Sequence, residues 1–355
     1  MKKIIMTGGG TAGHVTPNIA LMPALKEAGY DISYIGSYAG MEKGLIEAQG
    51  IKYYGISSGK LRRYFDWKNF TDPFKVLKGF FQAIHLIRKI KPNIVFSKGG
   101  FVSVPVVLAA KICHVPAIIH ESDITPGLAN RIAIPRAKKV CCNFPETMKY
   151  LPKDKAVLTG SPIRQELFGG SPEKALKYCN FPNHDKPVLL IVGGSSGSRI
   201  INEAVRNVLP ELLEKFNIIH LCGKGNLKPE LDSLTGYSQF EYANKELTDM
   251  FALCDIVISR AGANSICELL ALRKPNILIP LSAAASRGDQ ILNAKSFKKQ
   301  GFSVVLEEET LTDKLLLDTV KDTFENRDKY IKAMENSGQV DSIGTVISLI
   351  EETAK

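Results

Sequence analysis

The residues with the clearest chemical potential stand in one short stretch, Met6–Pro17, which reads MTGGGTAGHVTP. An apolar strand at 4–6 runs into small residues, and Thr16 and Pro17 read as the N-cap and first residue of a helix that continues to Gly29. Glycines let backbone N–H groups approach a ligand closely, and the following helix N-terminus adds partial positive charge. We therefore expect this turn to bind a phosphate. The alternative is a tight strand-to-helix turn without a ligand.

The same glycines match the dinucleotide-binding spacing G-x-G-x-x-G at 8–13. In that fold a carboxylate at the end of the second strand usually holds the ribose. Here the strand expected at 32–35 ends in Gly-Ser at 36–37, and His14 places an ionisable imidazole at the mouth of the helix. Both observations disfavour a dehydrogenase. The absence of a G-x-x-x-x-G-K-[ST] loop likewise disfavours ATP hydrolysis.

Strand and helix patterns alternate along the whole chain, which predicts parallel sheets covered by helices on both faces. A second glycine turn at 98–100 follows the strand expected at 93–97, and the strand expected at 117–120 ends beside His120, Glu121 and Asp123. The pattern pauses near residue 162. It starts again with a strand at 188–192, a glycine/serine turn at 193–198 and a helix expected at 200–213. Two similar α/β halves would form a cleft, with glycine turns at the carboxyl ends of the strands, where such sheets bind ligands.

An activated sugar suits these turns better than a redox cofactor does. A nucleoside diphosphate leaving group needs a metal ion or fixed dipoles, and the sequence contains no Asp-x-Asp pair. Glu268, early in a helix after the small-residue turn at 260–265, could accept hydrogen bonds from two ribose hydroxyls. Gln290 and Asn293, one helical turn apart, offer amides for sugar hydroxyls. The alternatives are a carboxylate that favours the helix start for Glu268 and a solvated helix start for the two amides.

Seven motifs, spaced in order along nearly the whole chain, resemble those of the MurG family. They are GGGTAGHVTP at 8–17, SKGGFVSVP at 97–105, HESDITPGLANR at 120–131, GSPIR at 160–164, GGSSGSR at 193–199, SRAGANSICE at 259–268 and DQILNA at 289–294. The resemblance implies an α/β GT-B fold of two Rossmann-like doubly wound domains. Residues 1–161 would form an acceptor- and membrane-facing domain joined by a last helix at about 340–355, and residues 162–339 would form the domain that binds UDP-GlcNAc.

The same resemblance implies metal-independent, inverting transfer of GlcNAc from UDP-GlcNAc to the muramoyl 4-hydroxyl of lipid I, giving lipid II, without a cofactor. The alternatives are another GT-B nucleotide-sugar enzyme, such as a UDP-GlcNAc epimerase or a glycolipid glycosyltransferase, and a regulatory protein that only binds the nucleotide sugar. An epimerase would need no acceptor, and a binding protein would turn nothing over.

The resemblance also assigns residues to the substrates. His14 is the candidate catalytic base, with Asp123 as the second candidate. The other assignments are Thr11, Ala12 and Gly13 at the donor/acceptor diphosphate, Arg164 and Ser195 on UDP-GlcNAc, Ala263, Asn264, Ser265, Ile266, Cys267 and Glu268 on uridine and ribose, and Gln290 on the GlcNAc. Two positions depart from the family pattern. Ser122-Asp123 stands where the family often has Gln-Asn, and Ala12 replaces a glycine.

The net charge of +10 is concentrated in one window, residues 60–91, which alone carries +7. Aromatic side chains interleave with these cations: Tyr64, Phe65, Trp67, Phe70, Phe74, Phe80 and Phe81. Apolar side chains flanked by cations suit an interfacial segment on an anionic leaflet. The alternative is that half of the aromatics belong to the core and the cations are merely solvated. No helix-turn-helix or zinc pattern supports a nucleic-acid partner.

The composition is that of a globular protein, because 45% of its 355 residues are hydrophobic and 23% are charged. No apolar run approaches the roughly 18 residues of a membrane span, and the start MKKII is too short for a signal peptide. Seven cysteines without a C-x-x-C or Cys/His ligand spacing favour a reducing compartment and no structural metal. We therefore expect a peripheral protein on the cytoplasmic side of the cell membrane.

Overall fold

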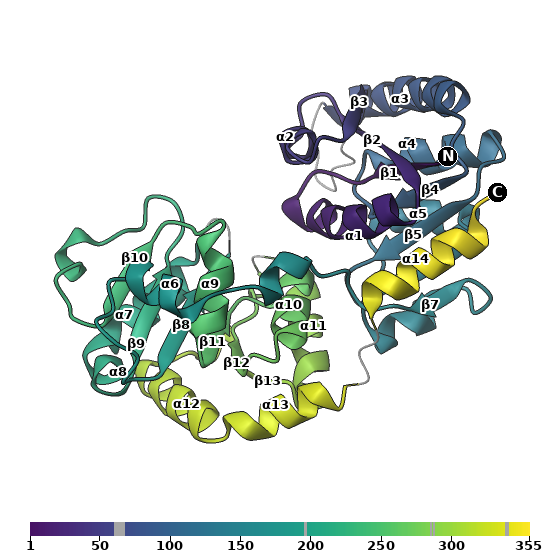
Figure 1. Ribbon diagram of the computed structural model, residues 1–355. Coiled ribbons are helices and arrows are strands. Elements are labelled where there is room, and N and C mark those ends of the chain that lie inside the picture. Colours follow the sequence, from purple (N-terminus) through teal and green to yellow (C-terminus); the bar gives the residue numbers. More distant parts are fainter. Residues whose placement is uncertain (60–67, 195–196, 285, 287, 338–340) are drawn as a thin grey trace. The chain divides into compact units, whose positions relative to one another are not determined.

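The computed structural model describes residues 1–59, 68–194, 197–284, 286, 288–337 and 341–355. The chain divides into two compact units (Figure 1), a first unit of residues 1–164 with 340–355 and a second unit of residues 165–339. The division falls between Arg164 and Gln165, a few residues beyond the boundary expected at 161. The last segment of the chain returns to the first unit.

The first unit is built on a seven-stranded parallel sheet in the order β3-β2-β1-β4-β5-β6-β7. Its strands are β1 Lys2–Thr7, β2 Tyr30–Ser37, β3 Lys52–Ile56, β4 Ile94–Ser97, β5 Ala117–Glu121, β6 Lys139–Cys142 and β7 Ala156–Leu158. Its helices are α1 Thr16–Glu27, α2 Met41–Glu47, α3 Lys68–Ile90, α4 Ser103–Ile112, α5 Leu128–Ala133 and α14 Ser342–Thr353, with 3₁₀ turns η1 Ala12–His14, η2 Ile134–Arg136 and η3 Pro145–Tyr150. The strand order reverses between β1 and β4, so the carboxyl ends of these two strands form the switch point of the sheet.

Side-chain alternation along β1 buries both faces of this sheet. Ile4 and Met6 belong to one core cluster and Ile5 to the other. Val346 and Ile350 of α14 are fully buried in the Ile4–Met6 cluster, and α14 contacts α1. Burial of each such side chain is worth about 1.5–3 kcal/mol, so α14 is an integral layer of the first unit.

The second unit repeats the plan with six parallel strands in the order β10-β9-β8-β11-β12-β13. The strands are β8 Val188–Val192, β9 Asn217–Leu221, β10 Tyr237–Phe240, β11 Ile256–Ser259, β12 Asn276–Leu278 and β13 Ser303–Val305. The helices are α6 Pro172–Tyr178, α7 Arg199–Asn207, α8 Leu209–Lys215, α9 Glu246–Leu253, α10 Ala263–Ala271, α11 Asp289–Lys299, α12 Asp313–Glu325 and α13 Arg327–Glu335, with η4 Gln165–Phe168, η5 Pro229–Leu231 and η6 Glu308–Thr310. Here the strand order reverses between β8 and β11.

Two local predictions are wrong. Thr16 is not the N-cap of α1 but its first residue, because the 3₁₀ turn η1 precedes it and Val15 takes the cap position. The single helix expected at 200–213 is two helices, α7 and α8, joined at Val208. Pro210 causes this break, since proline lacks an N–H and disfavours helical backbone before it.

The segment expected at the membrane lies partly in α3. Residues 60–67, and with them Trp67, lie outside the described residues. Farther along α3, Phe80 is half-buried against the core, whereas Phe74 and Phe81 are exposed. Within the described residues, no helix is long and apolar enough to cross a membrane.

Candidate functional site

Two glycine turns meet at the switch point of the first unit. The turn at 8–10 follows β1 and the turn at 98–100 follows β4. They interlock, because a Cβ on Gly100 would collide with the carbonyl oxygen of Gly9 and the φ of +85° at Gly100 favours glycine. The Lys98 N–H also donates to the Thr7 carbonyl at 2.9 Å. The predicted glycine turn is therefore half of a paired structure.

His14 lies at the end of η1, directly after the exposed residues Thr11 and Ala12 and the half-buried Gly13. Its ring Nδ1 is 3.0 Å from the Gly9 carbonyl oxygen and 3.1 Å from the Thr11 hydroxyl. A carbonyl oxygen only accepts hydrogen bonds, so Nδ1 carries the proton and Nε2 keeps the lone pair. Burial and then the positive charge of Lys98 lower the pKa of His14 from its ordinary value. The ring is thus a neutral base candidate at neutral pH.

Glu42 organises the backbone of the first turn from α2. It is fully buried, and its carboxylate accepts hydrogen bonds from the N–H groups of Gly10, at 3.3 Å, and Ser37, at 2.9 Å. The hydroxyl of Ser37 donates to it at 2.5 Å. This carboxylate of α2 lies against the last residue of β2, and its oxygens accept hydrogen bonds from the protein's own backbone and hydroxyl groups.

Asp123, the second base candidate, lies in a turn folded around Glu121. The buried Glu121 carboxylate accepts hydrogen bonds from the N–H groups of Asp123 and Gly127, each at 3.0 Å, and from the Asn130 amide at 2.9 Å. Burial raises the pKa of Glu121. Asp123 is half-buried, and Thr147 donates to its backbone carbonyl. The structure therefore places Asp123 at the carboxyl end of β5 in a well-fixed backbone.

The second unit presents its own turns at the switch point, after β8 and after β11. Ser198 caps α7 by accepting from the Ile201 N–H at 3.3 Å. The N-cap position of α10, which begins at Ala263, is Gly262, a residue that has no side chain to cap the helix. Backbone N–H groups in the first turn of a helix lack intrahelical partners, so this end is suited to a polar ligand.

The predicted uridine and ribose residues lie on α10, where they differ in accessibility. Ser265 is exposed and Asn264 half-buried, whereas the side chains of Ala263, Ile266 and Cys267 are buried. Those three can reach a ligand only through their backbone. Glu268 is half-buried in the second turn of α10, so its interpretation as a helix-start carboxylate is wrong.

The two predicted amides of α11 have different environments. Gln290 is half-buried, and its Oε1 accepts from the Leu281 N–H at 3.0 Å. Asn293 has no exposed surface, and its amide donates to the Ala261 carbonyl at 3.2 Å. The prediction that Asn293 binds sugar hydroxyls is therefore wrong. Its side chain instead ties α11 to the turn that precedes α10.

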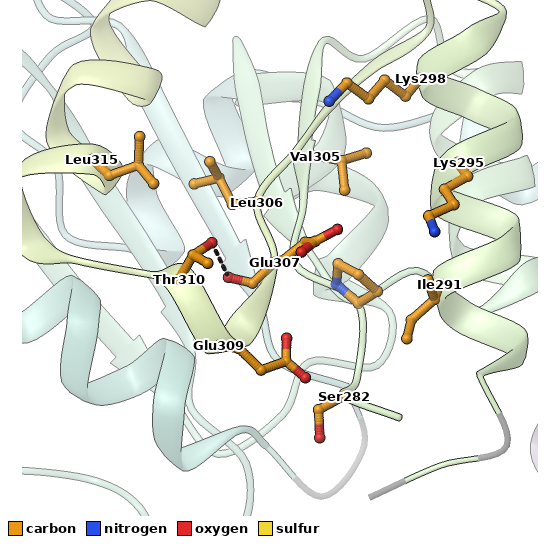
Figure 2. A pocket seen from close by; sticks show the side chains of 11 residues that line it. Ser282, Ile291, Lys295, Lys298, Val305, Leu306, Glu307, Glu309, Thr310 and Leu315 are labelled. Atoms are coloured by element: carbon orange, nitrogen blue, oxygen red, sulfur yellow. Dashed lines mark hydrogen bonds between the residues drawn. The ribbon is translucent and has the colours of Figure 1, made fainter. Parts of the chain in front are cut away.

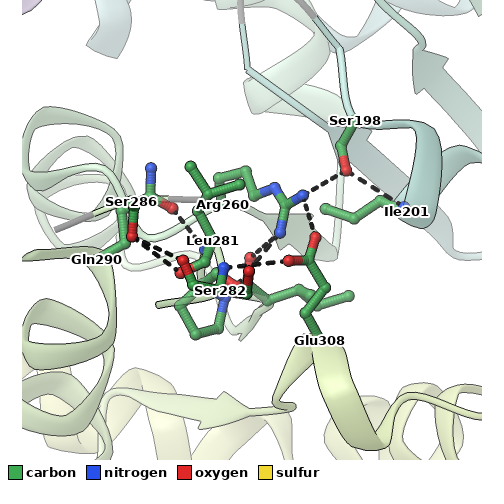
Figure 3. Close-up of polar contacts among 10 residues, drawn as sticks. Ser198, Ile201, Arg260, Leu281, Ser282, Ser286, Gln290 and Glu308 are labelled. Carbon is green, nitrogen blue, oxygen red and sulfur yellow. Dashed lines mark hydrogen bonds and ion pairs between the residues drawn. The ribbon is translucent and has the colours of Figure 1, made fainter. Parts of the chain in front are cut away.

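Arg260 and Glu308 form a largely buried ion pair in the second unit, with side chains 12% and 5% exposed and an Nη2–Oε1 distance of 2.5 Å (Figure 3). Arg260 also donates to the Ser198 hydroxyl at 2.6 Å and to the carbonyl of Ile279 at 3.1 Å. Glu308 accepts from the Ser282 N–H at 3.1 Å. The pair thus fastens together the turns after β8, β11 and β12.

A pocket of about 520 Å³ opens beside this network (Figure 2). Lysines of α11 line one part of it and glutamates near η6 line another: Lys295, Lys298, Glu307 and Glu309. Its wall includes Pro280 and Ser282, from the loop that Gln290 contacts. None of the described residues predicted to bind substrate lines this pocket.

Two predicted residues stand apart from these groups. Arg164 is half-buried at the end of the first unit, just before the division between the units. Ser195 lies outside the described residues. Among the residues that the structure describes, no group of three or more His, Cys, Asp or Glu is placed to hold a metal ion.

Sequence reasoning missed Glu42, Lys98, Arg260 and Glu308 as parts of the site. Lys98 and Arg260 carried one usable signal, since each follows a buried strand directly and precedes small residues. Charged side chains at that position lie at the ligand-binding edge of a parallel sheet. Glu42 and Glu308 gave no such signal, because their partners are brought to them only by the fold.

Comparison with known proteins agrees with this architecture. Residues 4–142 match the glycosyltransferase family 28 N-terminal domain, and residues 188–346 match the family 28 C-terminal domain. The chain is 65% identical to a UDP-N-acetylglucosamine–N-acetylmuramyl-(pentapeptide) pyrophosphoryl-undecaprenol N-acetylglucosamine transferase of Lachnoclostridium phytofermentans, over 99% of both chains. It is 62% identical to the transferase of the same name from Clostridium tetani, over 99% of this chain and 98% of that one.

A solved structure is similar over the same length. The crystal structure of Acinetobacter baumannii MurG matches with a TM-score of 0.77 and 27% identity, covering 99% of this chain and all of that one. Together with the family match and the two parallel sheets, this similarity confirms the predicted GT-B fold.

Proposed function

The chain belongs to the MurG family of UDP-N-acetylglucosamine–N-acetylmuramyl-(pentapeptide) pyrophosphoryl-undecaprenol N-acetylglucosamine transferases, and we infer that it transfers GlcNAc from UDP-GlcNAc to lipid I, giving lipid II. The observation that carries this conclusion is 65% identity to such a transferase over 99% of both chains. The protein is therefore a UDP-GlcNAc-dependent glycosyltransferase of peptidoglycan synthesis.

We propose a single displacement for the reaction. His14 Nε2 takes the proton of the muramoyl 4-hydroxyl as its oxygen attacks the anomeric carbon of GlcNAc, and the bond from that carbon to UDP breaks with its electron pair going to UDP. The tautomer at His14 supports this role, because the Gly9 carbonyl occupies Nδ1 and leaves Nε2 as proton acceptor. Asp123 is the second candidate for the base.

We assign the donor to the second unit. Glu268 would accept hydrogen bonds from the ribose hydroxyls, and the first turn of α10, at 263–265, would contact uridine and ribose through its backbone. Gln290 would bind the GlcNAc, and Arg164 and Ser195 would contact UDP-GlcNAc. In the first unit, residues 11–13 would lie at the diphosphate, and the exposure of Thr11 and Ala12 supports such a contact.

One assay tests the function. Labelled UDP-GlcNAc is incubated with the protein, with and without a lipid I analogue, and released UDP and labelled glycolipid are quantified. We expect UDP release only with acceptor, in amounts equal to labelled product. Acceptor-independent release of free sugar would instead indicate an epimerase. Binding of UDP-GlcNAc without turnover in either arm would indicate a regulatory binding protein.

We also propose that the protein is peripheral at the cytoplasmic face of the cell membrane, through the basic and aromatic stretch 60–91. In its described part, Phe74, Leu77 and Phe81 share one helical face of α3 with 75%, 53% and 61% of each side chain exposed. Lys75 and Lys78 are exposed on the same helix. Each cation near an anionic surface contributes roughly 1 kcal/mol.

Flotation with liposomes that contain anionic lipid tests this proposal. A Phe74→Ser/Phe81→Ser variant should float less than wild type, because two large apolar side chains no longer enter the interface. Tyr150→Ser is the matched control, since Tyr150 is an exposed aromatic side chain of the same unit outside α3. Equal flotation of the α3 variant and the control would refute the assignment.

A further inference from the structure

Lys98 carries a charged group in an unusual place, fully inside the first unit. Its side chain is 1% exposed, although it follows β4 in the glycine turn beside His14. Its Nζ lies 2.6 Å from His120 Nδ1 and 2.7 Å from the Ser122 hydroxyl. Burial of an ammonium group is costly unless hydrogen bonds compensate it, so these contacts fix its position.

The hydrogen bonds define the state of His120. Its Nε2 is 2.9 Å from the Gly160 carbonyl oxygen, which only accepts, so Nε2 carries the proton and Nδ1 accepts from Lys98. Burial and then the charge of Lys98 hold the pKa of His120 well below its ordinary value. His120 is therefore a neutral acceptor that holds the cation without cancelling its charge.

The backbone connects this cation to His14. Gly8 lies between them, because a Cβ on Gly8 would come 2.6 Å from the His14 carbonyl oxygen and 3.3 Å from Lys98 Cβ. Gly100 packs on the Gly9 carbonyl that holds the His14 ring. Ring and cation are thus carried by two interlocked turns that have no room for a side chain at Gly8 or Gly100.

We propose that Lys98 is a positioning residue for the His14 base, its ammonium held by His120 and Ser122 so that a fixed positive charge is carried by the turn that interlocks with the one holding the imidazole. This inference rests on the proposed role of His14 in the transfer reaction. Two charged side chains act on the ring, Lys98 from the turn after β4 and Glu42 from α2. Burial and then Lys98 favour the neutral imidazole and lower its pKa, whereas Glu42 opposes this, so the proton-accepting form persists to lower pH than in an ordinary histidine.

The pH profile of kcat/KM for the acceptor tests this inference. Lys98→Met removes the charge while keeping an unbranched side chain, and the acidic limb should move to higher pH by on the order of one unit. Lys98→Arg, which restores a cation, should move the limb back toward the wild-type position. Lys98→Gln keeps a donor for His120 Nδ1 without the charge and repeats the test if Lys98→Met does not fold.

Tyr34→Phe is the matched control. The buried Tyr34 hydroxyl donates to the Gly8 carbonyl at 2.8 Å, so its removal perturbs the same turn without changing any charge. Its acidic limb should stay in place even if activity falls. An unmoved limb in both neutral Lys98 variants, or an equal shift in Tyr34→Phe, would overturn the inference.

His14→Ala separates this inference from the function on which it rests. Loss of the limb in His14→Ala, with an unmoved limb in Lys98→Gln, would leave His14 as the base and refute the role of Lys98. Persistence of the wild-type limb in His14→Ala would refute the base assignment itself.

Discussion

The switch points of the two sheets have the same strand topology but differ in the charged side chains that lie there. In each unit the strand order reverses between two parallel strands, β1 and β4 or β8 and β11, and small-residue turns follow both strands. In the first unit a buried lysine donates to a neutral histidine and a hydroxyl. In the second, a largely buried arginine is paired with a carboxylate that also accepts a hydrogen bond from a backbone N–H.

This difference separates two uses of charge on the same scaffold. The Arg260–Glu308 pair compensates its own charge and fixes three turns relative to each other, which suits a rigid binding surface. The Lys98 cluster holds a cation on the turn that interlocks with that of His14 and lowers the pKa of this histidine after burial, which suits proton transfer. We therefore expect substitutions in the first unit to change kcat and those in the second to change stability or KM for UDP-GlcNAc.

The largest effect is expected from His14→Gln. Loss of a general base lowers kcat by about 10²- to 10⁴-fold, whereas KM for UDP-GlcNAc should stay near that of wild type. Steady-state kinetics with a soluble acceptor analogue measures both constants. His85→Gln on α3 is the control, because His85 is an exposed histidine of the same unit. A larger loss of kcat in Asp123→Asn than in His14→Gln would assign the base to Asp123.

Glu308→Gln should give the next largest effect, a loss of stability. It leaves the largely buried Arg260 beside an uncharged partner, and removal of one partner of a fully buried ion pair costs about 3–5 kcal/mol, which is the upper bound here. Calorimetric unfolding is the measurement. Glu335→Gln is the matched control, since Glu335 pairs with Arg273 at the exposed surface, where such pairs contribute about 0–1 kcal/mol. Equal destabilisation by both substitutions would contradict the role of the buried pair.

Glu268→Gln tests whether the second unit binds UDP-GlcNAc, and its expected effect is smaller than those of the two preceding substitutions. Hydrogen bonds to a charged group are worth about 1.5–3 kcal/mol, so KM for UDP-GlcNAc should rise roughly 10- to 100-fold with a smaller change in kcat. Glu203→Gln, on an exposed face of α7, should leave KM unchanged. If kcat fell and KM held in Glu268→Gln, the ribose assignment would be wrong.

The fold was largely predictable because parallel strands buried on both faces leave a strong apolar signal. Strands at 4–6, 32–35 and 188–192 were expected and lie in β1, β2 and β8. The break at Pro210 was readable from the residue itself and was missed, because the apolar pattern runs on through it. The 3₁₀ turn before Thr16 had no distinct signal, since it depends on how the glycine turn closes on His14.

Site residues were predictable where they directly follow a strand in the sequence. They were less predictable where residues that are far apart in the sequence contact each other. The turn that contains His14 and the turn after β11 lie at the strand ends where they were expected, but α10 already begins at Ala263, inside the turn expected at 260–265. Asn293 was misjudged because periodicity does not tell which face of α11 is buried. Arg260 and Glu308 are 48 residues apart, and no local pattern joins them.

Acid should expose the smallest difference, through the buried histidine of the second unit. His220 lies between the Tyr237 hydroxyl and the Asn202 Oδ1, at 2.9 and 3.0 Å, and burial lowers its pKa to about 3. The unfolded chain takes up the proton near pH 6.5, so the neutral ring stabilises the fold fully above that pH and progressively less as pH falls toward 3.

His220→Gln isolates this effect, because His120 in the first unit stays unchanged. Between pH 6.5 and 4 the free energy of unfolding of wild type should fall more steeply than that of the variant, by up to about 1.4 kcal/mol per pH unit. Denaturant unfolding at each pH measures the two curves. Parallel curves would mean that His220 does not gain a proton on unfolding, and the second unit would then owe its acid sensitivity to other groups.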